Sequence, residues 1–194
     1  MITHIKGKLV EKSPTSVIID VNGIGYLINI SLNTFSAIPD QENLKLYTHL
    51  QIKEDSHTLF GFYGLKEREI FRLLISVSGI GASIARTMLS SLTPEQIIQG
   101  ISIGDSVMIQ SVKGIGLKTS QRVIIELKDK VLKIYDLDDK VSFPNSNTAK
   151  EEALSALEVL GINKKTSEKL VDKIILDNAD ASVEFVIKEA LKKL

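Results

Sequence analysis

The sequence predicts an α+β protein of several domains: a β-barrel at the N-terminus, an all-helical middle and a bundle of helices at the C-terminus. Three observations predict this order. Hydrophobic residues alternate with a period of two over 1–64, the period becomes helical near residue 65, and a polar acidic stretch over 135–148 interrupts the helical part. We therefore expect a barrel domain at 1–64, a helical domain at 65–134, a flexible acidic linker at 135–148 and a second helical domain at 149–194.

The composition is that of a soluble globular chain. Of the 194 residues, 43% are hydrophobic and 25% are charged, which are ordinary values for folded domains. The absence of cysteine excludes disulfides and thiolate metal sites, and it fits a reducing cytosol. The N-terminus lacks the apolar run of a signal peptide, and no segment approaches the length of about 18 apolar residues that a membrane span needs. We therefore expect a cytoplasmic protein with no membrane partner.

The net charge is zero, which by itself argues against a nucleic-acid partner. The charges are unevenly distributed, however. Residues 65–130 hold nine Lys/Arg against six Asp/Glu, whereas the segments on either side are slightly acidic. The helical middle is therefore the one basic part of the chain, which is a weak indication of where an anionic partner would bind.

The barrel is predicted from strand-forming segments and one strong turn. Asn22-Gly23 lies between two apolar runs, and both residues tolerate the positive φ angles of a type I′ hairpin. Five short strands in this segment favour the five-stranded oligonucleotide/oligosaccharide-binding (OB) barrel. The expected strands cover 2–10, 17–21, 24–30, 44–52 and 58–62.

The middle domain begins with an amphipathic helix. Its apolar face is predicted to hold Leu65, Ile70, Phe71, Leu74 and Val77. Most of Lys66, Glu67, Arg68, Glu69 and Arg72 are predicted to lie on the other face. Another helix is expected to start at Thr93, which can cap it while Pro94 takes the first helical position and Gln96 reaches back. A final helix of this domain is expected over 119–132.

The last domain is predicted to be a three-helix bundle. Apolar residues recur at helical spacing in three groups over 149–194, and Gly161 is expected to end the first helix. Such a bundle lies near the lower size limit for independent folding.

The middle domain carries the same short motif twice. The segments VSGIG (77–81) and VKGIG (112–116) place their first glycines 35 residues apart. Two glycines around an isoleucine allow positive φ and let a phosphate approach without meeting a Cβ. The isoleucine would fill the core, and the following helix would point its free N–H groups at the same anion. The pattern predicts two helix-hairpin-helix motifs that bind the DNA backbone and not the bases.

A simpler interpretation is that Gly-Ile-Gly only ends one helix and starts the next. One copy would favour that interpretation, but two copies in register, with basic residues around the second, favour DNA binding. The predicted contacts to the DNA backbone are Gly79, Ile80, Gly81, Ser83, Arg86, Lys113, Gly114, Ile115, Gly116, Lys118, Thr119 and Arg122.

No catalytic residue, metal site or cofactor is expected. The segment GIGLKT (114–119) is similar to a P-loop, but Leu117 stands where a P-loop has glycine before its lysine, and no strand precedes the segment. The motifs of serine hydrolases and zinc proteases are also missing. We therefore expect no ATP hydrolysis and no catalysis by this chain on its own.

The ordered set of motifs resembles the RuvA family, whose members bind Holliday junctions. The resemblance covers essentially the whole chain, and the ordered set is more specific than the hairpins alone. It is carried by VNGIGY (21–26), THLQIKED (48–55), LFGF (59–62), the hairpin at 77–81, GIGLKT (114–119), ALEVLGI (156–162) and IKEAL (187–191).

This resemblance implies a non-catalytic subunit that recognises four-way junction DNA, holds it open and targets the hexameric RuvB ATPase for branch migration. It implies a role in DNA recombination, DNA repair and the SOS response of a bacterium. It further implies a homotetramer, with an octamer on DNA as the alternative assembly and RuvC as another candidate partner.

Two further sites are implied by the resemblance. Glu54 and Asp55 match an acidic pin that repels phosphates at the crossover, although the residues alone indicate only a solvated turn between two strands. The terminal bundle is implied to contact RuvB, with Leu157, Leu160 and Ile162 as candidates that could equally be core residues.

The chain departs from the family pattern at Ser83 and Leu117, where lysines are frequent after the hairpins. We therefore expect weaker and less salt-sensitive DNA binding.

Two other functions stay open: a glycosylase or nuclease that uses the same hairpins, and an interaction adaptor with no DNA role. Strand scission or base loss would favour the first, and the absence of a gel shift on four-way junctions would favour the second.

Overall fold

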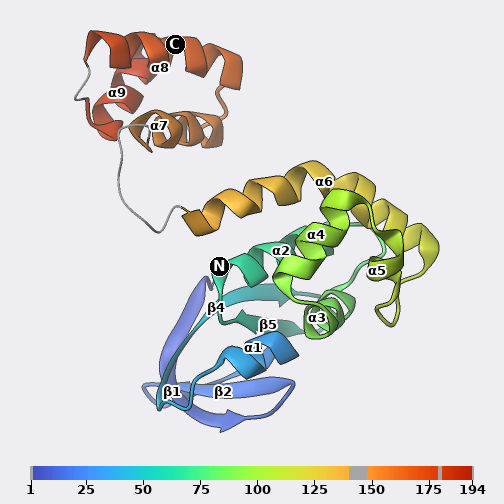
Figure 1. The fold of residues 1–194 in the computed structure, drawn as a ribbon. Helices are drawn as coiled ribbons and strands as arrows, with labels where there is room; N and C mark the ends of the chain where they lie inside the picture. Colours follow the sequence, from blue (N-terminus) through green and yellow to red (C-terminus); the bar gives the residue numbers. More distant parts are fainter. Residues whose placement is uncertain (1, 140–147, 179–180, 194) are drawn as a thin grey trace. The chain divides into compact units, whose positions relative to one another are not determined.

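The computed structural model describes residues 2–139, 148–178 and 181–193 (Figure 1). The chain divides into two compact units, Met1–Val141 and Ser142–Leu194. Each unit has a hydrophobic core of its own and is described by itself.

The first unit begins with a closed five-stranded barrel in the order β1-β2-β3-β5-β4. Antiparallel pairing of β1 with β4 closes the barrel, and β3 pairs with β5 in parallel. The five predicted strands are confirmed with ends shifted by at most two residues, and so is the OB barrel. The strands are β1 His4–Lys12, β2 Ser16–Val21, β3 Ile24–Ile30, β4 Asn43–Ile52 and β5 His57–Phe62.

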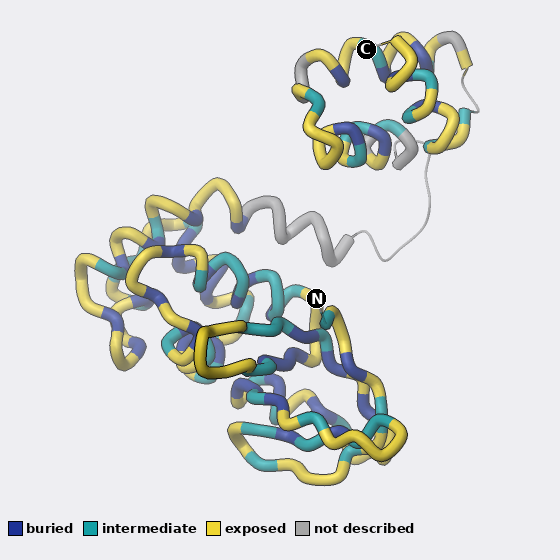
Figure 2. The backbone as a smooth tube through the Cα atoms, turned by 180° about the vertical axis from the view of Figure 1, so that it is seen from behind, coloured by how far each residue is buried: buried dark blue, intermediate teal, exposed yellow. Residues whose placement is uncertain are grey.

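The predicted hairpin turn between β2 and β3 is present. Asn22 has φ 54° and Gly23 has φ 90°, as a type I′ turn requires. The Gly23 N–H also donates to Oδ1 of Asp20 over 3.0 Å, which fixes the turn. Over β2 and over 43–48 of β4, buried positions alternate with less buried ones, whereas β5 ends in three consecutive buried residues. The turns at the barrel ends are exposed (Figure 2).

A short helix that the sequence did not predict, α1 (Leu32–Ala37), lies between β3 and β4. Ser31 caps it, because its side chain accepts a hydrogen bond from the Thr34 N–H over 2.9 Å. Six residues are too few for a helical period to stand out in the sequence, so α1 could not be recognised by pattern.

The helical part of the first unit holds five helices among the described residues. The capping box predicted at the start of α4 is confirmed, with Thr93 and Gln96 bonding reciprocally and Pro94 at the first helical position. The short α5 was not predicted. The helices are α2 Leu65–Ile75, α3 Ala82–Ser91, α4 Pro94–Ile103, α5 Ser106–Gln110 and α6 Leu117–Asp139.

Barrel and helices share a core. Phe60 and Phe62 of β5 point into the helical cluster, where their ring centroids lie 5.1 Å and 4.9 Å from that of Phe71 in α2. The expected boundary after residue 64 is therefore a change of secondary structure within one packed unit.

The expected start of the linker at Tyr135 is wrong, because α6 continues to Asp139. No glycine or proline occurs between Leu117 and Asp139, so nothing in the sequence stops the helix there. Residues 140–147 of the expected linker lie outside the described residues, and Thr148 already belongs to the next helix.

The second unit is a bundle of three helices in its described part, as predicted: α7 Thr148–Val159, α8 Lys164–Asp177 and α9 Val183–Lys193. Each helix contributes fully buried residues to one core, including Leu157, Val171 and Val186. Gly161 follows α7 with φ 86°, which is the left-handed conformation expected after a helix end.

Candidate nucleic-acid interface

The two predicted hairpins have the same geometry. In the first, the Ile80 N–H donates to the Val77 carbonyl over 3.0 Å, and in the second the Ile115 N–H donates to the Val112 carbonyl over 3.1 Å. Both isoleucines are 5% exposed and belong to the core of the helical part. The hairpins link α2 to α3 and α5 to α6, so the sequence repeat is a structural repeat.

The two glycines of each hairpin differ in backbone conformation. Gly79 and Gly114, the first of each pair, have φ 95°, a conformation that side chains with a Cβ rarely adopt. Gly81 instead has φ −86° and precedes α3 as its N-cap. The sequence allowed a positive φ at both glycines of each hairpin, but only the first glycine of each has one.

The surface over the hairpins is open. A Cβ added at Gly79, Gly81 or Gly116 would meet no atom within 4 Å, and one at Gly114 would meet only Ile84, at 3.9 Å. The space beside these four glycines is therefore open to a ligand as bulky as a phosphate.

The N-terminus of α3 has no side-chain cap. This contrasts with α1 and α4, whose first N–H groups are satisfied by Ser31 and Thr93. Free N–H groups and the positive end of the helix dipole together favour an anion at this point.

Several predicted contact side chains surround the hairpins. Lys113, Lys118 and Ser83 are exposed, and Thr119 is half-buried. Neither lysine forms an ion pair with any residue that the structure describes, so both ammonium groups are available to an external anion.

The two predicted arginines have partners within the protein. Arg86 donates from Nη1 to Oδ1 of Asn29 over 2.8 Å and to the Thr15 carbonyl over 3.3 Å. It therefore joins α3 to the barrel, a role that differs from the expected phosphate contact. Arg122 donates to the Ser78 carbonyl of the first hairpin over 3.2 Å.

Glu54 and Asp55 form the tip of the turn between β4 and β5. Both are exposed, and the Lys53 N–H closes the turn by donating to the Ser56 carbonyl over 2.8 Å. The Ser56 hydroxyl donates to Oδ1 of Asp55 over 3.2 Å. Two carboxylates at one turn tip make a local negative site that disfavours close approach of phosphates.

One polar cluster at the joint between barrel and helices was missed from the sequence. Glu67 of α2 is only 6% exposed and accepts hydrogen bonds from the hydroxyls of Ser31 and Thr34, the latter over 2.6 Å. Burial raises the pKa of the Glu67 carboxyl, and the two hydroxyl bonds partly oppose that shift. Glu67 is therefore an exception among the charged residues that were expected mostly on the polar face. The signal was present, because Glu67 precedes Ile70, Phe71 and Leu74 by three, four and seven residues.

The described residues hold no group of three or more His, Cys, Asp or Glu that could bind a metal ion. Among the helices in those same ranges, none is both long and apolar enough to cross a bilayer.

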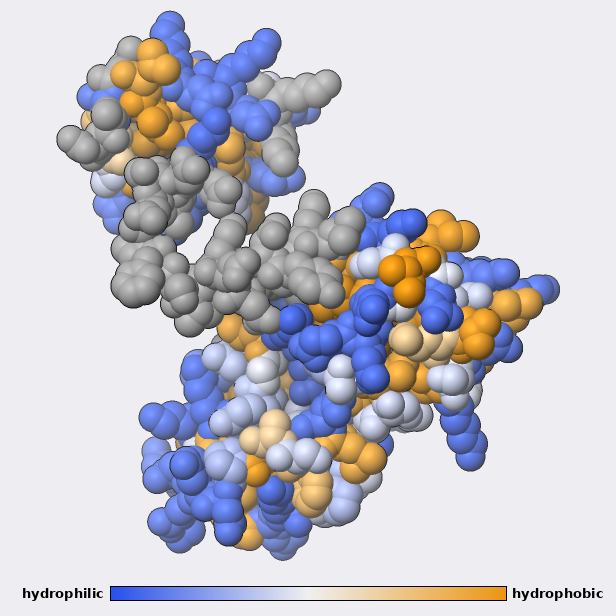
Figure 3. Space-filling view, viewed as in Figure 1, coloured by the Kyte–Doolittle hydropathy of each residue, from blue (hydrophilic) through white to orange (hydrophobic). Residues whose placement is uncertain are grey.

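The candidate RuvB contacts in the second unit divide by burial. Leu157 is fully buried in the bundle core, which does not fit the prediction that it touches a partner. Leu160 is 59% exposed, and Ile162 is partly buried against the core. Hydrophobic side chains are visible on the surface of this unit (Figure 3). The exposed ones are Val159, Leu160, Leu176, Phe185 and Leu191.

A closed OB barrel packed against two helix-hairpin-helix motifs defines a protein of the class that holds nucleic acid by its backbone. Family models divide the chain in the same way. Residues 1–61 match the RuvA N-terminal domain, residues 71–129 match a SAM-like tandem of helix-hairpin-helix motifs, and residues 148–194 match the RuvA C-terminal domain.

Relatives match over the full chain. The Holliday junction branch migration complex subunit RuvA of Flavobacterium psychrophilum is 64% identical, and that of Christiangramia forsetii is 62% identical, each with 100% of both chains covered. The corresponding subunit of Bacteroides fragilis is 47% identical, also over 100% of both chains. The chain belongs to the RuvA family.

Proposed function

We propose that this chain is the non-catalytic DNA-binding subunit of a Holliday junction branch migration complex, acting in DNA recombination and repair. The observation that carries this function is the duplicated hairpin, with both first glycines at φ 95° and open space above the backbone. Its relatives are named as RuvA subunits of that complex.

The hairpins grip DNA through the backbone. In the first hairpin, α3 begins after Gly81 with no side-chain cap and so offers free N–H groups to a phosphate. Lys113 and Lys118 add positive charge beside the second hairpin. None of these groups selects a base, so recognition depends on the shape of the DNA.

The acidic turn selects the crossover. Glu54 and Asp55 repel phosphates, so DNA strands at a four-way junction are kept apart and open around the turn, whereas a continuous duplex is disfavoured there. This role needs several copies of the turn close together, and we propose a homotetramer, with two tetramers on one junction as a second assembly state.

The second unit recruits the motor. We propose that its exposed apolar surface, including Leu160, docks a RuvB hexamer, with RuvC as a further partner on the open junction. The expected site of action is the bacterial cytoplasm.

A band shift tests this function. Labelled four-way and duplex DNA of equal length are titrated with the protein at moderate salt, with and without RuvB. We expect preferential binding of the four-way junction, a further shift with RuvB and junction-dependent ATP turnover by RuvB. Equal affinity for both DNAs contradicts the proposal, and strand scission or base loss in Mg²⁺ favours the enzyme alternative.

A further inference from the structure

We propose that Asn33 is a positioning residue for junction recognition, because it fastens the helix of the first hairpin to the barrel that carries the acidic turn. This inference rests on the proposed function. It adds that α1, the short helix between β3 and β4, holds the phosphate-binding hairpin and the acidic turn in one fixed arrangement. We call Ser31 and α1 together the clamp.

The first step concerns α3, whose two ends have different partners. Its N-terminus is the first hairpin, and its ten residues span about 15 Å at the usual rise per residue. Its C-terminal half packs against α1. A rigid helix transmits position from one end to the other, so the bonds at its C-terminal half, together with those of Arg86 to the barrel, place Gly79 and Gly81.

Asn33 supplies the strongest bonds at that C-terminal half. Its Nδ2 donates to the Leu89 carbonyl over 2.7 Å and to the Leu92 carbonyl over 2.9 Å. Carbonyls at a helix end lack partners within the helix, so Asn33 satisfies two groups that need an external donor. The Leu32 N–H adds a bond to Oγ of Ser90 over 3.1 Å.

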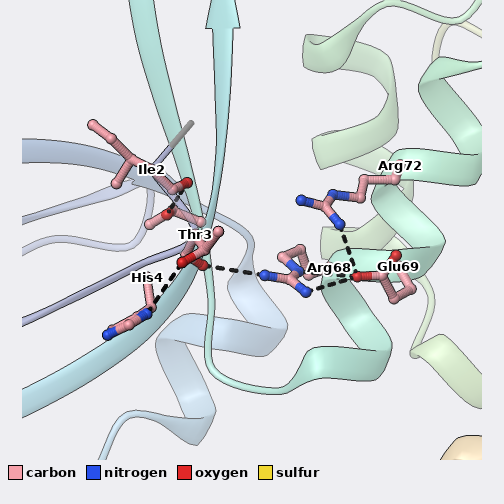
Figure 4. A network of polar contacts seen from close by, with 7 residues as sticks. Ile2, Thr3, His4, Arg68, Glu69 and Arg72 are labelled. Atoms are coloured by element: carbon pink, nitrogen blue, oxygen red, sulfur yellow. Dashed lines mark hydrogen bonds and ion pairs between the residues drawn. The ribbon is translucent and has the colours of Figure 1, made fainter. Parts of the chain in front are cut away.

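Further bonds hold the clamp itself in place. Ser31 and Thr34 of the α1 segment donate to the buried Glu67 of α2, and the Tyr63 N–H donates to Oγ1 of Thr34 over 3.1 Å. Just before β1, the Thr3 carbonyl accepts a hydrogen bond from Arg68 of α2 over 3.1 Å, and Arg68 also pairs with Glu69 (Figure 4). These bonds hold α1 against α2 and the barrel, and the two Asn33 bonds extend that attachment to the end of α3.

This fixed arrangement matters for a junction and not for a duplex. Binding a duplex needs only the hairpins, whereas binding a junction needs the hairpins and the acidic turn in place at once. A loose joint adds conformational freedom that junction binding must remove. Loss of Asn33 should therefore lower the preference for four-way DNA without disabling the hairpins.

The test compares Asn33→Asp and Asn33→Ala with wild type and with Asn43→Asp, an exposed position on β4 that controls for the added charge. The aspartate has the shape of asparagine but opposes two carbonyls and the negative end of α3. We expect affinity for the four-way junction to fall by about tenfold in both Asn33 variants, with duplex affinity unchanged within about twofold. An equal loss on both DNAs, or no loss on either, overturns the inference.

A second measurement needs no DNA. Because the chain contains no cysteine, Glu11→Cys in the barrel and Gln99→Cys in α4 give one pair of spin labels in each chain, both at exposed positions. Labelled chains are diluted into an excess of unlabelled chains, so that distances between subunits do not contribute. We expect a narrow distance distribution in wild type and a broader one in both Asn33 variants. An equally narrow distribution in the variants refutes the clamp. Failure of the proposed function would appear instead as a wild-type protein that does not prefer four-way DNA.

Discussion

The guanidinium of Arg122, on the helix that follows the second hairpin, donates to the Ser78 carbonyl of the first hairpin over 3.2 Å. The two residues are 44 positions apart in the chain. This bond links the helix of the second hairpin to the first hairpin, so it helps to set the spacing of the two proposed phosphate sites. Arg122 also lies 4.0 Å from Glu126 in its own helix, a contact that orients the guanidinium.

The first prediction separates this tether from a direct phosphate contact. Arg122→Gln should lower DNA affinity several-fold while the salt dependence stays as in wild type, because the guanidinium is engaged within the protein. Lys118→Gln, at an exposed cation next to the second hairpin, should reduce the salt slope by about one. Affinities measured at several salt concentrations check both, and a reduced slope for Arg122→Gln would restore Arg122 as a phosphate ligand.

The second prediction concerns the left-handed glycines. Gly79→Ala forces a Cβ into φ 95°, at a cost of about 1–2 kcal/mol, and also places a methyl group where the phosphate approaches. Gly104→Ala is a matched control, because Gly104 has φ 78° and open space above it but ends α4 and belongs to neither hairpin segment. Urea unfolding should show similar destabilisation for both variants, and a gel shift should show loss of DNA binding only for Gly79→Ala. Equal DNA binding by the two variants would refute the hairpin assignment.

The features that the sequence predicts correctly are those encoded by a few adjacent residues. The Asn22-Gly23 turn, the Thr93 capping box and the two glycine hairpins are encoded within a few adjacent residues, and all were predicted from pattern. The clamp was not, because Asn33 acts on carbonyls more than fifty residues away and α1 is too short to show a period. The burial of Glu67 was missed because its charge was given more weight than its spacing. The partners of Arg86 and Arg122 depend on tertiary packing that no local pattern contains.

The third prediction follows from the buried carboxyl of Glu67. Its pKa is raised above the ordinary value of 4.5 in the folded protein, so the folded state holds the proton more tightly than the unfolded chain. Its contribution to stability is therefore fully present below pH 4.5 and is lost as the pH rises through the folded pKa. Glu67→Gln should remove this component, so the stability of wild type relative to the variant should fall with rising pH in that window.

Urea unfolding of both proteins across the acidic range checks this sign. The difference in unfolding free energy between the two proteins isolates the contribution of Glu67, because His49 is present in both. The pKa of His49 is lowered by burial and by Arg72 and Arg68, so its contribution to stability rises with pH, opposite to that of Glu67. A difference that does not vary with pH would mean that Glu67 is not the titrating group.

The fourth prediction concerns the acidic turn. The double variant Glu54→Gln and Asp55→Asn should bind four-way junctions as well as wild type or up to about tenfold more tightly, because repulsion of phosphates is removed. Its preference for four-way over linear DNA should fall at the same time. Glu11→Gln with Asp40→Asn removes the same charge from exposed positions elsewhere on the barrel and should leave the preference unchanged. A collapse of junction affinity in the first variant would contradict the repulsion mechanism.

The fifth prediction tests the surface of the second unit. Leu160 is 59% exposed directly after α7, whereas the neighbouring candidate Leu157 is buried. Leu160→Asp should therefore leave folding and junction binding intact, because substitutions at exposed positions change stability little. Its stimulation of RuvB should fall by about tenfold, because a charge replaces an apolar contact. Thr166→Asp adds the same charge at an exposed polar position on α8, outside the apolar surface, and should keep the stimulation. Junction-dependent ATP turnover by RuvB measures both, and full stimulation by Leu160→Asp would remove this residue from the docking surface.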